Sequence, residues 1–155
     1  YYVVGHFHYV MAVAGTFSIF GGVYYWFPKI TGRMYSEALG KLGFWITFAG
    51  TNIVFWIMMD IGVKGMPRRY FDYAHFPQFE NAHQWMTGGA ALIGVGFALA
   101  VINWIVGAAK GPKATDNPWG SQSLEWTTQT PPPPGNWKDV PAIREEWDPY
   151  AYARR

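Results

Sequence analysis

The sequence predicts an all-α membrane protein with three transmembrane helices and an extended C-terminal tail. Two observations support this fold class. First, no Asp, Glu, Lys or Arg occurs in residues 1–28, 42–59 or 81–109, although charged residues crowd the segments between and after them. Each uncharged stretch reaches or exceeds the ~18 apolar residues that indicate a membrane span. Second, the remainder of the chain is rich in Pro, Trp and charge, which does not favour a further helix.

We expect the three helices at about residues 2–27, 42–60 and 84–109. Pro28 follows the first expected helix and opens a turn-rich loop. Aromatic residues gather near the span ends, as is typical of side chains at the headgroup level; they are Tyr24, Tyr25, Trp26, Trp85 and Trp104. The chain therefore divides into a transmembrane region at 1–109 and an extramembrane tail at 110–155.

Composition narrows the possible chemistry. The chain has no cysteine, so any metal must be held by imidazole, carboxylate or thioether groups. Its net charge of +2 is too small to favour a nucleic-acid partner. Because the sequence begins with Tyr, we expect a fragment, a split subunit or a processed chain. Frequent small residues, such as Gly88, Gly89, Gly94 and Gly96, favour packing inside a larger helical bundle.

The run His6-Phe7-His8 lies inside the first uncharged stretch. An ionisable side chain at membrane depth is costly, so it indicates a functional site. On a regular helix, residues two positions apart project about 200° apart with about 3 Å of rise. His6 and His8 therefore face nearly opposite ways and cannot share one metal ion. This geometry suits two separate centres, one on each side of the helix.

Several interpretations of the two histidines are open. They could be polar residues bonded to neighbouring helices, or ligands of copper or zinc. Haem iron takes one axial imidazole per face and fits the geometry better. Phe7 is then either a core aromatic or part of the shortest covalent route between two haems. The other histidines, His75 and His83, lie in or beside a polar loop and are interpreted as interfacial residues without a ligand role.

Arg68 and Arg69 lie in the loop between the second and third expected helices. They could contact lipid headgroups. Alternatively, guanidinium groups pair bidentately with carboxylates, and haem propionates are carboxylates. In an antiparallel three-span topology this loop lies on the same membrane face as the start of the first span. The arginines are therefore predicted on the same side as His6 and His8.

These motifs resemble subunit I of the haem–copper cytochrome c oxidases. Residues 1–10 resemble its helix ten, and residues 22–32 resemble the end of that helix and its loop. Residues 65–73, which contain Met-Pro-Arg-Arg-Tyr, resemble the loop between helices eleven and twelve. Residues 123–126 and the following proline run resemble the C-terminal tail. The resemblance therefore covers nearly the whole chain and implies a place in a twelve-helix bundle.

The resemblance implies roles for individual residues. His6 would be the proximal ligand of the high-spin haem a3 and the catalytic residue of this chain. His8 would be an axial ligand of the low-spin haem a, with Phe7 between the two haems. Arg68 and Arg69 would hold haem propionates. Electrons from cytochrome c would reach these haems through a copper-bearing subunit II, and oxygen would be reduced to water with proton pumping.

The resemblance also implies what this chain needs from outside. The ligands of the copper ion at the haem–copper site belong to earlier helices, so activity requires the remainder of subunit I. We expect an integral protein of a bacterial plasma membrane, rather than of the mitochondrial inner membrane, in contact with lipid. Two alternatives stay open: a non-catalytic haem-binding or assembly protein, and a membrane electron carrier with two b-type haems.

Overall fold

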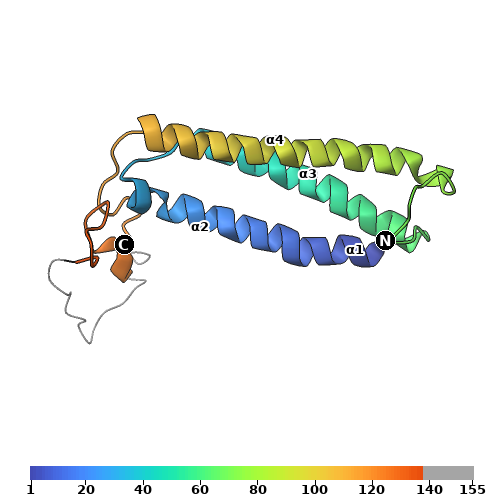
Figure 1. Cartoon of the computed structure of the whole chain (residues 1–155), viewed down its shortest axis with the longest axis horizontal. Helices are drawn as coiled ribbons and strands as arrows, with labels where there is room; N and C mark the ends of the chain where they lie inside the picture. Colours follow the sequence, from blue (N-terminus) through green and yellow to red (C-terminus); the bar gives the residue numbers. More distant parts are fainter. Residues whose placement is uncertain (138–155) are drawn as a thin grey trace. The chain divides into compact units, whose positions relative to one another are not determined.

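The structure, a computed structural model, describes residues 1–137, and in this range it contains helices and loops but no strand. The helices are α1 (Tyr2–Phe7), the π-helix η1 (His8–Val13), α2 (Ala14–Thr31), α3 (Glu37–Val63), the 3-10 helix η2 (Pro77–Phe79), α4 (Glu80–Lys110) and the 3-10 helix η3 (Leu124–Trp126) (Figure 1). Three runs are long and apolar enough to cross a membrane: Tyr2–Thr31, Glu37–Val63 and Pro77–Lys110. The predicted fold class is confirmed.

The first helix extends past Pro28, where the sequence predicted its end, and stops at Thr31. A proline inside a helix removes one backbone donor and crowds the carbonyl four residues earlier, yet α2 continues for three residues beyond Pro28. The hydroxyl of Thr31 donates to the carbonyl of Phe27 at 2.8 Å, and the N–H of Gly32 donates to the carbonyl of Pro28 at 2.8 Å. Gly32 has a φ of +72°, the left-handed conformation that commonly ends helices.

The second and third helices extend into the charged residues that flank their apolar centres. Salt bridges between residues four apart support both ends of α3, with Glu37–Lys41 at 2.9 Å and Asp60–Lys64 at 2.6 Å. Charge therefore marks where an apolar span ends, whereas the backbone hydrogen bonds of the helix continue for another turn.

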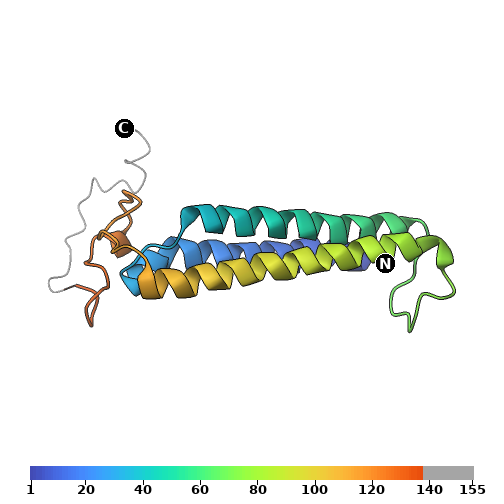
Figure 2. The same cartoon turned by 90° about the horizontal axis from the view of Figure 1, so that it is seen from above.

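The chain forms two compact units, and the first contains residues 1–21 and 37–102. In this unit the three long helices lie side by side (Figures 1 and 2). Glycines bring α3 and α4 close together: a Cβ at Gly50 would lie 2.7 Å from the carbonyl oxygen of Gly89, and one at Gly43 would lie 3.3 Å from that of Gly96. These small residues are thus used for helix packing within the chain.

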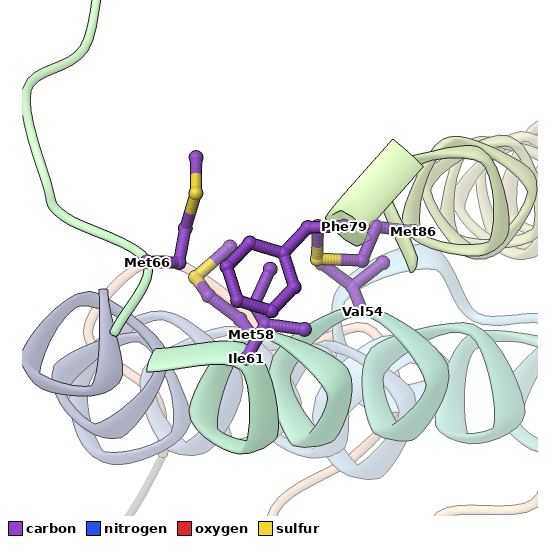
Figure 3. Packing of buried hydrophobic residues seen from close by; sticks show 6 residues of the cluster. All are labelled: Val54, Met58, Ile61, Met66, Phe79 and Met86. Carbon is purple, nitrogen blue, oxygen red and sulfur yellow. The ribbon is translucent and has the colours of Figure 1, made fainter. Parts of the chain in front are cut away.

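A hydrophobic core closes one end of this unit. Six buried side chains converge there from α3, the following loop, η2 and α4 (Figure 3); they are Val54, Met58, Ile61, Met66, Phe79 and Met86. Met66 is only 1% exposed, so the loop that carries the arginines is anchored by its first apolar residue. Met58 packs in this core.

Among the described residues, the second unit contains residues 22–36 and 103–137. The N–H of Met34 donates to the carbonyl of Pro112 at 2.8 Å, and that of Ala114 donates to Gly32 at 2.9 Å. The described part of the predicted tail is therefore folded against the end of α2. The rest of the predicted tail, residues 138–155, lies outside the described residues.

Candidate functional site

The histidine run lies where α1 gives way to the π-helix η1. Gly5 is buried against α3: a Cβ there would lie 2.8 Å from Cγ of Met59 and 3.0 Å from the carbonyl oxygen of Phe55. Successive residues of an α-helix are turned about 100° around its axis. Measured from Gly5, His6 is therefore turned by about 100° in one direction and His8 by about 60° in the other. Ideal α-helix geometry would thus send the two imidazoles to opposite sides of the line where α1 touches α3; here His8 packs on Phe55 of α3 and His6 is exposed.

The imidazole of His8 has a defined tautomer. Its Nδ1 lies 2.7 Å from the carbonyl oxygen of Val4. A carbonyl oxygen only accepts hydrogen bonds, so Nδ1 is the donor, and in the neutral imidazole Nε2 then carries the lone pair. A backbone carbonyl bound to the far nitrogen is the usual partner of a metal-ligating histidine, because it orients the ring and raises its basicity. His8 can therefore bind a metal ion through the lone pair of Nε2.

Aromatic rings flank His8 on two sides. The ring of Phe55 stacks on the imidazole with centroids 5.2 Å apart and planes inclined by 17°. The ring of Phe7 stacks on it at 4.4 Å. Phe7 is itself 42% exposed, so part of its side chain is accessible to a neighbouring group outside the described chain.

His6 lies in different surroundings. Its side chain is exposed, and its ring stacks on Tyr2 of the same helix at 6.5 Å. Each histidine therefore offers one imidazole in its own direction. This donor pattern fits two haem irons, each of which takes a single ligand from one face. Within residues 1–137, no three His, Cys, Asp or Glu side chains gather as they would around a metal ion.

The structure adds residues near His8 that the sequence did not single out. The hydroxyl of Tyr9 donates to Oδ1 of Asn52 at 2.9 Å, and Nδ2 of Asn52 donates to the carbonyl of Phe48 at 2.8 Å. The available signal in the sequence was one amide side chain in the middle of an uncharged span. Such a polar group needs a partner inside a membrane.

The loop that carries Arg68 and Arg69 docks at the start of α1, as the topology predicted. The backbone nitrogen of Tyr1 donates to the carbonyl of Met66 at 2.9 Å, and the hydroxyl of Tyr70 donates to that of Tyr1 at 3.1 Å. Both arginines are exposed, and neither guanidinium has a hydrogen bond or an ion pair to another described residue. Two fixed cations are thus left available to an anion outside the described chain.

Arg69 has an unusual backbone. Its φ is +60°, in the left-handed region that costs a non-glycine residue roughly 1–2 kcal/mol. Such strain persists where the surrounding structure imposes it, and it clusters at ligand-binding positions. The anchors on either side, Met66 and Tyr70, hold the loop in this conformation.

His83 is more buried than its predicted interfacial position suggested. It is 7% exposed, and its ring stacks on Tyr73 at 4.4 Å while Tyr1 and Tyr70 lie within 6.1 Å of it, centroid to centroid. Its Nε2 has no hydrogen-bonding partner among the described residues. His75, in contrast, is exposed.

Comparisons with known proteins identify the family of this chain. The family described as "Cytochrome C and Quinol oxidase polypeptide I" matches residues 1–92, more than half of the chain. The chain is 45% identical over 152 residues to cytochrome c oxidase subunit 1 of Thermostichus vulcanus, which covers 98% of this chain and 27% of the relative.

Two further relatives show the same relationship. The heme-copper oxidase subunit I+III of Aeropyrum pernix is 41% identical, with 94% of this chain and 18% of the relative covered. Cytochrome c oxidase subunit 1 of Bacillus sp. PS3 is 40% identical, with 93% of this chain and 24% of the relative covered. The chain thus spans about a quarter or less of the length of these relatives. On this evidence the chain, an integral membrane protein with three helices able to span the bilayer, belongs to the cytochrome c and quinol oxidase polypeptide I family.

Proposed function

We propose that this chain is the C-terminal part of the catalytic subunit of a terminal respiratory oxidase, which transfers electrons from cytochrome c to oxygen and pumps protons. The observation that carries the proposal is the arrangement at His6 and His8. The imidazole of His8 packs on Phe55 of α3 and that of His6 is exposed, and the bond from His8 Nδ1 to the carbonyl of Val4 leaves Nε2 to bind a metal. The family membership supports the same conclusion.

His6 would be the ligand of the high-spin haem a3, and His8 a ligand of the low-spin haem a. When bound, the haems supply the electron-carrying and oxygen-binding chemistry. The chain's own part is to hold each imidazole and to keep Phe7 between them. His6 and Phe7 are exposed, which leaves room for a bound group beside α1.

Arg68 and Arg69 would hold the haem propionates. Their guanidinium groups are exposed, lie in a loop fixed at the start of α1, and make no ion pair with the described residues. A carboxylate that enters between them can accept charge-assisted hydrogen bonds. The left-handed Arg69 supports the view that this loop is shaped for a ligand.

The proposal also assigns partners and a place. The copper ligands would come from the remainder of subunit I, and electrons would arrive through a copper-bearing subunit II. Residues 1–109 would lie in the membrane among lipids, and residues 110–155 outside it. The bacterial relatives, such as that of Bacillus, favour a bacterial plasma membrane.

The test uses the membrane complex that contains this chain. His6→Ala should abolish the carbon-monoxide-reactive a-type haem, and His8→Ala should abolish the low-spin spectrum. His75→Ala, which removes an exposed histidine from a loop, is the matched control and should leave both spectra unchanged.

Two outcomes would contradict the proposal. If His6→Ala and His8→Ala left both haem spectra intact, the residue assignments would be wrong. If the isolated chain held two b-type haems that do not bind carbon monoxide, it would be an electron carrier or a haem-binding protein instead of part of an oxidase.

A further inference from the structure

His8 differs from His6 in its contact with a neighbouring helix. The imidazole of His8 stacks on Phe55 of α3 with planes only 17° apart, whereas His6 stacks only on Tyr2 of its own helix among the described residues. The His8 ring is therefore held by Phe7 and Val4 of its own helical run and, in addition, by a ring from a different helix.

The contact between His8 and Phe55 matters because the backbone changes its helix type at His8. The π-helix begins at His8 and runs to Val13. A π-helix departs from the i→i−4 hydrogen bonds that fix side-chain directions along an α-helix, and such segments are frequent at functional sites. The direction of His8 thus depends on what holds the π segment in place.

Asn52 holds the π segment from α3. Its Nδ2 donates to the carbonyl of Phe48 at 2.8 Å, which fixes the amide and aims Oδ1 outward. Oδ1 accepts the hydroxyl of Tyr9, the residue next to His8, at 2.9 Å. Asn52 and Phe55 are one helical turn apart on α3, so the hydrogen bond and the stacked ring act on His8 together. The ring of Tyr9 also packs edge-on against Phe55 at 5.8 Å.

We propose that Asn52 and Phe55 are positioning residues for His8: Asn52 holds the π segment through Tyr9, and Phe55 fixes the plane of the imidazole. This inference rests on the proposed function, in which His8 ligates a low-spin haem. It goes further by assigning the orientation of that ligand to α3. It also predicts an asymmetry between the two histidines, because the ring of His6 has no equivalent contact with α3 among the described residues.

The orientation of an axial imidazole has a direct readout. In a low-spin ferric haem, the g values of the electron paramagnetic resonance spectrum depend on the planes of the axial rings. The test compares Tyr9→Phe, Asn52→Leu and the double variant in the assembled membrane complex. Tyr9→Phe removes one oxygen atom and keeps the ring that packs on Phe55, so the complex is expected to assemble.

Each single variant should shift the largest g value of the low-spin haem and broaden its signal, with a shift in its midpoint potential. Because both single changes remove the same hydrogen bond, the double variant should match either one instead of adding their effects. Phe55→Leu should broaden the signal further, because the flat surface under the imidazole is lost. The carbon-monoxide spectrum of the His6 haem should stay unchanged and serves as an internal control.

Tyr24→Phe is the matched control for the loss of a phenol. Its hydroxyl is buried and has no hydrogen-bonding partner in residues 1–137, so this variant should keep the wild-type g values. Unchanged g values in Tyr9→Phe, Asn52→Leu and Phe55→Leu, with the low-spin signal abolished in His8→Ala, would overturn this inference and leave the proposed function standing. A low-spin haem that survives His8→Ala would overturn the proposed function itself.

Discussion

The hydroxyl of Tyr70 donates a hydrogen bond to the hydroxyl of Tyr1 across 3.1 Å, which joins two residues 69 positions apart. Their rings also meet edge to face at 5.6 Å. Tyr70 directly follows Arg68 and Arg69, and Tyr1 precedes the helix that carries His6 and His8. This contact therefore connects the predicted anion-binding loop to the predicted haem-ligand helix.

Tyr70→Phe should loosen the arginine loop. The change removes the hydroxyl bond and keeps the ring, so the expected cost is about 1 kcal/mol, the net value of a typical hydrogen bond. Hydrogen exchange of the backbone around residues 64–70 should become faster. Tyr73→Phe is the control, because the described chain offers its hydroxyl no hydrogen bond and its ring contact with His83 is retained. Equal exchange rates in the two variants would mean that the hydroxyl pair does not hold the loop.

The Tyr1–Tyr70 contact should weaken at alkaline pH. Burial, and then the hydrogen bond shared with Tyr70, raise the pKa of the Tyr1 phenol above its ordinary value of 10.0. Because the folded pKa is the higher one, the contribution of the contact is complete below the ordinary pKa and is lost as the pH rises through the folded pKa. Tyrosinate absorbance should show a late-titrating group that is missing from Tyr1→Phe. A Tyr1→Phe titration that matches wild type in its late part would contradict this.

Gly5→Ala should separate α1 from α3. The new Cβ would lie 2.8 Å from Cγ of Met59 and 3.0 Å from a backbone oxygen, and the backbone cannot move aside cheaply. Overpacking of this kind costs about 1–3 kcal/mol. Thermal denaturation followed by haem absorbance should show a lower midpoint and altered spectra of both haems. Gly15→Ala, where a Cβ meets nothing within 4 Å in the described chain, is the comparison variant. A comparable loss in both variants would show that the Gly5 contact is not special.

Arg69→Asn tests the charge at the strained position and keeps its backbone. Asn tolerates the left-handed region, so the φ of +60° can be maintained while the cation is lost. A nearby positive charge favours the reduced haem, so its removal should lower the haem midpoint potential in a spectroelectrochemical titration. Arg69→Lys keeps the charge and loses the bidentate fork, and should cause a smaller decrease. Identical potentials in Asn, Lys and wild type would exclude propionate binding by Arg69.

Lys29→Met should release the folded part of the tail. The Lys29 ammonium is 6% exposed, donates to the carbonyls of Asp116 at 2.9 Å and Thr128 at 2.7 Å, and lies 5.0 Å from the ring of Trp126. Its loss leaves two carbonyls without this donor, at a cost of about 1–3 kcal/mol. Limited proteolysis should cut residues 112–137 faster than in wild type. Lys41→Met, at an exposed lysine, should leave the rate unchanged; a similar increase there would rule out a specific role for Lys29.

Much of the membrane architecture was predictable because it depends on local composition. A helix that crosses the bilayer needs an uncharged stretch as long as the hydrocarbon core is thick. The long stretches without charge therefore located all three spans. The helix ends were less predictable. Pro28 marked a break in the sequence, yet the helix continues to Thr31 because Thr31 and Gly32 supply closing bonds that composition does not reveal.

The sequence alone determined that His6 and His8 point in different directions, since that follows from the period of one helix. The tertiary structure decided how each histidine is held. Val4, which binds His8, lies on the same helix. Phe55, which stacks on His8, and Asn52, which binds Tyr9, lie on α3. Their contacts depend on how closely Gly5 lets α1 approach α3. Local periodicity thus sets the direction of a side chain, whereas its environment is set by residues distant in the chain that only packing brings together.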